Sequence, residues 1–136
     1  MPSPLNMPTP AFATGATISD ALEHVLVTSP KVIVDTPQDV VALRGLVDLT
    51  FGADATAITL NIRRGSTIGG TLVTAGNTWG PYPVIGSAEG QFVAMGFDDS
   101  PAAFGEVYVL TATAAGNDTA TTVNGAYLEV IVQSQT

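Results

Sequence analysis

The sequence contains no cysteine, one histidine and only four basic residues, and each shortage removes a class of function. Without cysteine there can be no disulfide, no thiolate nucleophile and no cysteine-ligated zinc site. Zinc and non-haem iron sites usually need two or more imidazole or thiolate ligands, which a single histidine cannot supply. We therefore expect no metal and no cofactor, and a structural role for His24.

The shortage of basic residues limits the partners. Four Lys and Arg residues stand against twelve acidic ones, for a formal net charge of -8 at pH 7. Binding to phosphate backbones needs clustered cations that displace counterions. We therefore expect neither nucleic acid nor an anionic membrane as a partner. No stretch approaches 18 uninterrupted apolar residues, and no basic segment precedes an apolar one at the N-terminus, so we expect no membrane span and no signal peptide.

What remains is a chain with much apolar and little charged material. A length of 136 residues predicts one domain. Hydrophobic residues make up 46% and charged residues only 12%, where about 25% charged is typical. The chain can therefore build a real core, and its surface is largely neutral. Such a surface suits burial in an assembly.

The first 17 residues differ from the rest because prolines occupy positions 2, 4, 8 and 10. Proline fixes φ and has no amide hydrogen, so this segment should not form a helix or join a ladder efficiently. We interpret residues 1–17 as an extended arm; a floppy terminus is an equal alternative. Apolar groups within the segment favour an arm that packs on a partner, and its candidate partner-binding residues are Pro4, Leu5, Met7 and Phe12.

Beyond the arm, residues 18–136 predict one β-sandwich domain. Residues 41–51 alternate, with one apolar face made by Val41, Leu43, Val47, Leu49 and Phe51. Gly45 in this segment predicts a bulge or bend. Ile58, Leu60 and Ile62 alternate with polar residues, which indicates a half-buried strand with a solvated outer face. Because Gly52-Ala53-Asp54 separates the two segments, we expect them to form a hairpin.

Further strands are predicted along the rest of the chain. Residues 19–27 fit either a helical turn, with Asp20 and Glu23 as a capping box, or a strand, which we favour. Turn residues separate the later strands, which we place near residues 71–74, 91–97, 104–113 and 121–133, the last one bent at Asn124-Gly125. About eight short strands at regular spacing are typical of an antiparallel sandwich or jelly roll. We therefore predict an all-β, jelly-roll-like antiparallel β-sandwich.

Carboxylates offer the main route to an active site, and it is a weak one. Asp98 and Asp99 are adjacent, so a strand would point them to opposite faces and a turn would use them to satisfy local amides. The acidic residues show no EF-hand spacing for calcium. The glycine-rich run Gly65–Gly70 lacks the Lys-Ser/Thr end of a phosphate loop. We therefore expect that the chain is not an enzyme.

Two groups of residues are surface candidates. Arg63 and Arg64 predict either an interface anchor or a solvated strand end. Trp79 and Tyr82 lie among Pro and Gly residues, in a segment typical of a rigid loop, and Trp, Tyr and Arg dominate interface hot spots. An equal alternative is that Trp79 plugs one end of the sandwich. A carbohydrate-stacking loop is a third, weaker hypothesis.

Four stretches together resemble a known group of proteins: Val40–Gly45, Ile58–Gly65, Gly70–Val73 and Asn124–Val130. Between residues 40 and 132 the chain resembles β-rich structural proteins of tailed bacteriophages, namely jelly-roll capsid decoration (cement) proteins and related tail modules. The resemblance is one of pattern, without a catalytic motif.

The resemblance implies a virion component, made in the host cytoplasm, that lies on the capsid surface and stabilises the capsid lattice by binding the major capsid protein. It also implies a homo-oligomer, often a trimer. Burial of outward apolar residues such as Leu46 or Val93 between subunits would favour such a trimer. The alternative hypothesis is a receptor- or glycan-binding module of a phage tail or cell surface, which would use Trp79 and Tyr82.

Overall fold

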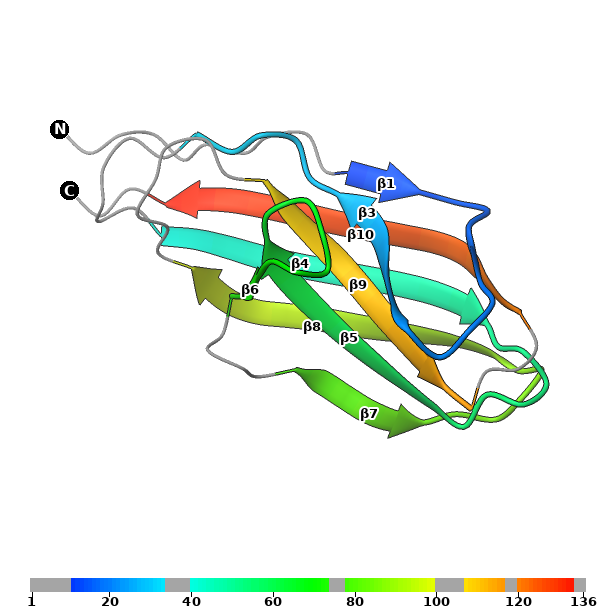
Figure 1. Cartoon of the computed structure of the whole chain (residues 1–136). Coiled ribbons are helices and arrows are strands. Elements are labelled where there is room, and N and C mark those ends of the chain that lie inside the picture. The colour runs from blue at the N-terminus through cyan, green and yellow to red at the C-terminus, as the bar shows by residue number, and fades with distance from the viewer. Residues whose placement is uncertain (1–10, 34–39, 74–77, 100–106, 117–119, 134–136) are drawn as a thin grey trace, which may run out of the picture.

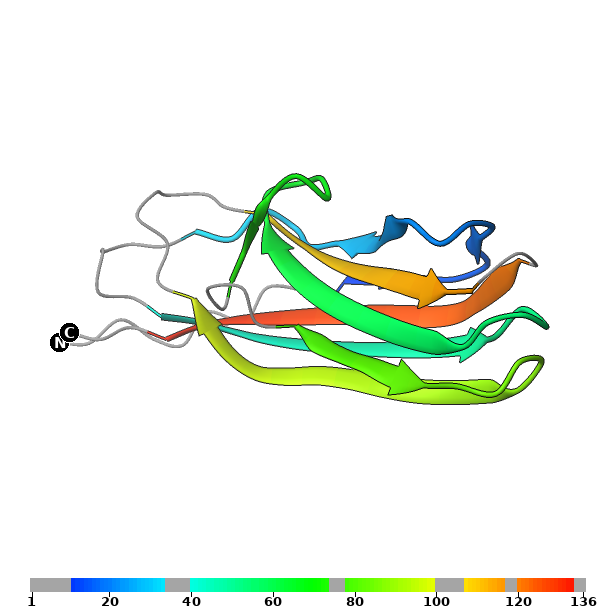
Figure 2. The same ribbon diagram turned by 60° about the horizontal axis from the view of Figure 1, so that its bottom comes forward.

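A computed structural model describes residues 11–33, 40–73, 78–99, 107–116 and 120–133. In these ranges the chain forms ten strands and no helix, arranged as two antiparallel sheets packed face to face (Figures 1 and 2). The predicted all-β sandwich is therefore confirmed. Pro4, Leu5 and Met7 of the expected arm lie outside the described residues.

Each sheet contains five strands. Sheet A has the order β1 (Ala11–Ala13), β10 (Thr121–Gln133), β4 (Val40–Thr50) and β8 (Glu89–Asp99), and β2 (Thr17–Ile18) also pairs with β10. Sheet B has the order β3 (Glu23–Thr28), β9 (Tyr108–Ala115), β5 (Ala57–Arg64) and β6 (Thr71–Leu72), and β7 (Trp79–Pro83) also pairs with β5.

The chain passes repeatedly from one sheet to the other. The connections from β3 to β4, β4 to β5, β7 to β8, β8 to β9 and β9 to β10 all cross between the layers. This wrapping, with each layer made of strands distant in sequence, is the jelly-roll arrangement.

The hairpin expected between residues 41–51 and 58–62 is wrong. Strand β4 lies in sheet A and β5 in sheet B, so the turn between them joins the two layers. At its end the amide of Thr56 donates to the carbonyl of Ala115 at 2.9 Å, which pairs the chain with β9 rather than with β4. Both strands carry a full apolar face, and opposite layers let both faces meet in one core.

The core lies between the inner faces that the alternation predicts. Val41, Leu43, Val47 and Leu49 on β4 are at most 1% exposed, as are Ile58, Leu60 and Ile62 on β5. Tyr108 is fully buried among them. The residues between these positions on β4 point outward, so the position of every outward side chain follows from the burial of its neighbours.

The predicted bend at Asn124-Gly125 is confirmed, whereas the predicted irregularity at Gly45 is wrong. The register of β10 against β4 shifts between Val123 and Gly125. Gly45 pairs regularly with Leu128 and Ala94, and the nearest shift lies between Leu43 and Arg44 in the pairing with β8. Gly45 instead allows close packing of the layers, because a Cβ there would lie 2.9 Å from both methyl carbons of Leu110.

The strand interpretation of residues 19–27 is confirmed by β3, which begins after a turn. In that turn the carboxylate of Asp20 accepts hydrogen bonds from the amide of Leu22 at 3.0 Å and lies 2.6 Å from the Nε2 atom of His24. The hydrogen bond with His24, and after it the one from Leu22, lowers the pKa of Asp20 below its ordinary value. His24 thus contacts a local turn residue.

Part of the expected arm belongs to the sandwich. Ala11, Phe12 and Ala13 form β1 and pair with Leu128, Tyr127 and Ala126 of β10. The expectation that this end of the segment would not join a ladder is wrong, because the four prolines all precede residue 11. An arm formed by residues 1–10 stays a prediction.

The close packing at Gly45 can be tested by one methyl group. We expect Gly45→Ala to lower the free energy of unfolding by about 1–3 kcal/mol, because the added Cβ meets a fully buried leucine. Gly125→Ala is the matched control in the neighbouring strand, where a Cβ would meet only the Phe12 ring at 3.5 Å. Urea denaturation should show a change within about 0.5 kcal/mol for the control. Equal effects of the two substitutions would contradict this role of Gly45.

Candidate interaction surface

The outer face of sheet A carries an apolar row that crosses four strands. Phe12 of β1 pairs with Tyr127 of β10, Tyr127 with Leu46 of β4, and Leu46 with Val93 of β8. The exposed fractions are 67% for Phe12, 40% for Leu46 and 46% for Val93, while Tyr127 is half-buried. These side chains are therefore neighbours on the outside of the sandwich. We call these four residues the sheet A row.

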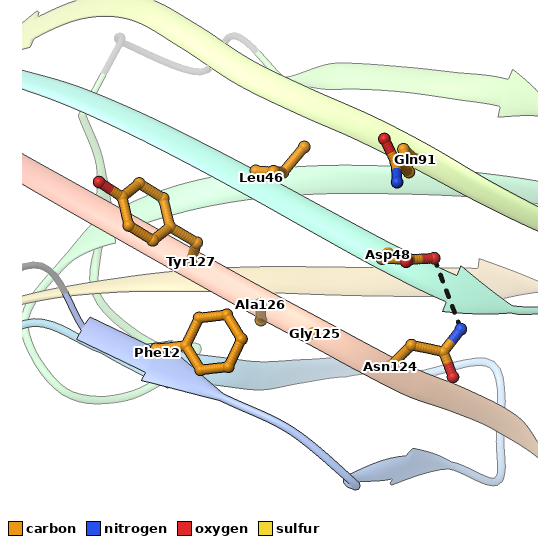
Figure 3. Close-up of a pocket in the computed structure, with 8 residues that line it drawn as sticks. All are labelled: Phe12, Leu46, Asp48, Gln91, Asn124, Gly125, Ala126 and Tyr127. Atoms are coloured by element: carbon orange, nitrogen blue, oxygen red, sulfur yellow. Dashed lines mark hydrogen bonds between the residues drawn. The ribbon is translucent and has the colours of Figure 1, made fainter.

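A shallow groove of about 220 Å³ lies along this row. Figure 3 shows Phe12, Tyr127 and Leu46 on its apolar side, and Asp48, Gln91 and Asn124 on its polar side. Gly125 has no side chain, and the Phe12 ring lies beside it. The absence of a side chain at this bulge helps to create the groove.

Polar side chains border the row on one side, held by hydrogen bonds among themselves. The Asn124 amide nitrogen donates to Thr50 Oγ1 at 2.8 Å, to Glu89 Oε2 at 3.2 Å and to Asp48 Oδ1 at 3.5 Å (Figure 3 shows the bond to Asp48). Asn124 is the extra residue of the bulge, so the irregularity places this amide between three acceptors.

The opposite border carries a pair of unlike charges. Arg44 of β4 and Glu129 of β10 are register partners, and Arg44 Nη1 lies 3.9 Å from Glu129 Oε1. The Tyr127 hydroxyl donates to Glu129 Oε2 at 2.9 Å, and this hydrogen bond raises the pKa of Tyr127 above its ordinary value. An apolar centre with polar borders is the usual composition of a protein interface.

The outer face of sheet B is organised differently, around an internal ion pair. The guanidinium of Arg63 donates from Nε and Nη2 to the two carboxylate oxygens of Glu23, each at 2.8 Å, and from Nη1 to the Gly70 carbonyl at 2.8 Å. The Thr111 hydroxyl also donates to Glu23. The side chains of Arg63 and Glu23 are only 18% and 17% exposed.

This network determines the ionisation of Glu23. Burial on its own would raise the pKa of Glu23, but the hydrogen bonds from Arg63 and Thr111, together with the positive charge of Arg63, outweigh burial and hold that pKa below its ordinary value. The glutamate therefore stays charged and connects β3, β5 and β9.

The predicted solvated outer face of strand β5 is therefore wrong at Asn61 and Arg63. Asn61 is 6% exposed and the Arg63 side chain is covered as well, because Glu23 and the loop that carries Gly70 lie over them. All three nitrogens of the Arg63 guanidinium donate hydrogen bonds within the chain. Its neighbour Arg64 is half-buried at the end of β5.

The aromatic residues of β7 lie at the edge of sheet B. Trp79 is half-buried and packs against the core. Tyr82 is 38% exposed and stacks on Phe92 of sheet A, with ring centroids 5.8 Å apart and an interplanar angle of 25°. Phe92 in turn packs against Phe51 in a T-shaped arrangement, with ring centroids 5.8 Å apart. Tyr82 thus links the two layers where β7 passes beside β8.

The structure does not bring the candidate residues into one site. Phe12 lies on the outer face of sheet A, whereas Arg63, Arg64, Trp79 and Tyr82 belong to β5 and β7 of sheet B. Sequence reasoning missed Tyr127, although it noted Leu46 and Val93 as outward apolar residues. The alternation carries a signal for each of the three, but only the strand register shows that they are neighbours of Phe12.

The described strands and loops hold neither a metal-ligand cluster nor a membrane-spanning helix. No three His, Asp or Glu side chains there are grouped so that they could hold a metal ion. No helix long and apolar enough to cross a membrane occurs in the same part of the chain.

Comparison with known proteins identifies the fold. No family model matches the sequence, and no curated protein matches it. Among solved structures, T=1 particles derived from infectious bursal virus give a TM-score of 0.62 at 8% identity over 98% of this chain. The structure of the Gt strain of infectious bursal disease virus gives 0.59 at 11% identity over 93% of this chain, and the VP2 subviral particle of that virus gives 0.55 at 8% identity over 98%.

These likenesses are structural and cover only part of the neighbours. This chain spans 33–36% of the length of the three viral chains. At 8–11% identity the comparison shows a shared jelly-roll fold, one that occurs in viral particle proteins. The resemblance to tailed bacteriophages in particular stays a prediction.

The ion pair of sheet B should stabilise the fold. We expect Arg63→Ala to lower the free energy of unfolding by about 2–3 kcal/mol, because it leaves the half-buried Glu23 without its main partner. Arg44→Ala is the control, since Arg44 is 60% exposed and 3.9 Å from its acid, and we expect a change within about 0.5 kcal/mol. Chemical denaturation checks both variants. An Arg63→Ala protein as stable as the control would show that the network contributes nothing.

The same network predicts an acid-sensitive fold. Since folding lowers the pKa of Glu23, its stabilising contribution is present above the ordinary glutamate pKa of 4.5 and is lost as the pH falls through the lower pKa of the folded state. We expect Glu23→Gln to be less stable than the wild type at neutral pH and to lose less stability on acidification. Unfolding free energies measured over this pH range test the point. Curves of the same shape for both proteins would rule out this linkage.

Proposed function

We propose that this chain is a structural protein of a virus particle, of the capsid decoration type, and that it works through protein–protein contacts without catalysing a reaction. The observation that carries the proposal is the sheet A row, an apolar surface left exposed on an otherwise well-packed jelly roll.

The sheet A row supports a contact role because of its composition and its support. Its side chains stand on paired strands of one sheet, so little backbone entropy is lost when a partner covers them. Aromatic and aliphatic groups at the centre and polar groups at the border suit a specific interface. Contiguous apolar side chains exposed on a protein surface often mark an interaction site.

The fold supports a particle protein as the setting for that contact. The three viral particle structures align with nearly the whole chain while this chain covers about a third of each. The fold alone hosts many functions, so the virion role rests on its combination with the exposed row. The low charge content, 12% of residues, also suits a surface that is covered in an assembly.

Within this proposal the major capsid protein is the partner and the capsid surface the location. Sheet B and the loops offer further exposed apolar side chains for such a contact: Val25 on β3, Ile68 between β5 and β6, and Ile85 between β7 and β8. The glycan-binding alternative needs both Trp79 and Tyr82 on the surface, and Trp79 packs against the core instead. We therefore favour the structural role.

The location can be tested on intact particles of the virus that encodes this chain. We expect a density map to show the two-layered sandwich on the outside of the capsid, in contact with the major capsid protein. Particles produced without the chain should release their genome at a lower temperature, and addition of the purified chain should restore the wild-type temperature. Particles of normal stability that never contain the chain would refute the proposal. Density on the tail alone would refute the capsid location.

A further inference from the structure

We propose that a second copy of this chain covers the sheet A row, with the two outer faces of sheet A packed against each other about a two-fold axis. The axis runs along the strands and passes between β10 and β4, the two central strands of the sheet. The inference uses the same sheet A row that carries the proposed function, but its argument rests on the geometry of sheet A and not on a virion role.

The order of the strands makes the face complementary to itself. Sheet A reads β1, β10, β4, β8 across its width. A two-fold axis between β10 and β4 places β10 over β4 of the second copy, and β1 over β8 of the second copy. All four strands that carry the row are then matched, and none is left without a counterpart.

The apolar residues match in size under this operation. Phe12 lies over Val93 of the second copy, and Tyr127 over Leu46 of the second copy, and the symmetry repeats both contacts. Each aromatic ring therefore meets a smaller aliphatic group, which allows side chains of two packed sheets to interdigitate. Four such contacts cover groups that are 40–67% exposed in the isolated chain, apart from the half-buried Tyr127.

The charges match as well. Arg44 and Glu129 stand directly opposite each other on β4 and β10, two register positions along from Leu46 and Tyr127 and therefore on the same face. The same axis places Arg44 over Glu129 of the second copy and Glu129 over Arg44 of the second copy. Arg44 is 60% exposed and only 3.9 Å from its own Glu129, so its guanidinium can reach a second carboxylate. Each chain has a net charge of -8, and at this border the two chains form two contacts between Arg44 of one copy and Glu129 of the other.

The other border also fits the arrangement. Asp48 and Asn124 lie on β4 and β10, on the opposite side of the row from Arg44 and Glu129. The axis places the Asp48 carboxylate over the Asn124 amide of the second copy, so an acceptor meets a donor. An axis at right angles to the strands would instead place every apolar side chain over its own copy and Arg44 over Asp48. The two arrangements therefore predict different charge partners.

The size of the surface is adequate for a stable pair. Strands spaced about 4.8 Å apart with a rise of about 3.4 Å per residue present roughly 600 Å² of sheet over β1, β10, β4 and β8. Side chains that project from the sheet add to this accessible area. Each face therefore approaches the area that one partner buries in a standard interface, about 800 Å². Sheets stacked in this way lie about 10 Å apart, the spacing that side chains of these sizes fill.

Charge reversal followed by mixing tests the pairing. Sedimentation over a concentration series should show wild-type dimers. We expect Arg44→Glu and Glu129→Arg each to raise the dimer dissociation constant by about tenfold or more, since each places like charges face to face twice. An equimolar mixture of the two variants should restore dimers, because every contact at this border then joins a cation to an anion.

Two further variants act as controls for the mixing experiment. Leu46→Lys should abolish dimers, because it places two charges at the centre of the apolar row. Lys31→Glu reverses an exposed charge outside the strands of sheet A and should leave the dissociation constant within about twofold of wild type. Circular dichroism shows whether each variant is folded, and the charge-reversal pair decides the question if the Leu46→Lys chain does not fold.

Several results would overturn the proposal. A wild-type chain that stays monomeric at every concentration removes the pair. A trimer, which the resemblance to decoration proteins implies, contradicts the two-fold axis. Dimers that persist in Leu46→Lys use another face. If the Arg44→Glu and Glu129→Arg chains are each monomeric and their mixture stays monomeric, Arg44 does not face Glu129 of the second copy. If Asp48→Arg is monomeric and its mixture with Arg44→Glu forms dimers, the axis lies at right angles to the strands.

Discussion

The whole structure depends on the burial of alternate side chains between two sheets. On β4 and β5 every second residue is almost fully enclosed, and a shift of one residue in either strand would expose all of them. The register is therefore fixed by the core. Because outward positions are fixed by the same register, the burial of Val47 and Leu128 determines where Leu46 and Tyr127 stand on the outside. The surface row is a consequence of core packing.

The two outer faces satisfy their side chains in different ways. Sheet B directs Arg63, Glu23 and Thr111 toward one another, so its charged groups are used within the chain and join three of its strands. Sheet A leaves an apolar row exposed, with Arg44 and Glu129 at one border and Asn124 at the other. The first face stabilises the fold and the second is available to a partner. This asymmetry is the reason why we propose the outer face of sheet A as the interaction surface.

Sequence reasoning found what depends on local pattern. The alternation of residues 41–51 and 58–62, the strand at residues 23–28 and the bend at Asn124 all follow from period two and turn residues. The hairpin between β4 and β5 was wrong because a turn sequence does not reveal whether it joins strands in one sheet or in two. The role of Gly45 was predicted wrongly because the side chain that leaves no room for a Cβ there belongs to Leu110, on a strand of the other layer. Glu23 and Arg63 are 40 positions apart, so their pairing depends on the topology.

The central claim is that the outer face of sheet A, and not the aromatic edge at β7, is the surface that a partner covers. Hydroxyl-radical footprinting measures the solvent exposure of aromatic side chains, and Phe12 and Tyr127 report on one surface while Tyr82 reports on the other. With rising protein concentration, or in the assembled particle, the account predicts protection of Phe12 and Tyr127 with an unchanged Tyr82. Protection of Tyr82 while Phe12 and Tyr127 stay reactive would contradict it.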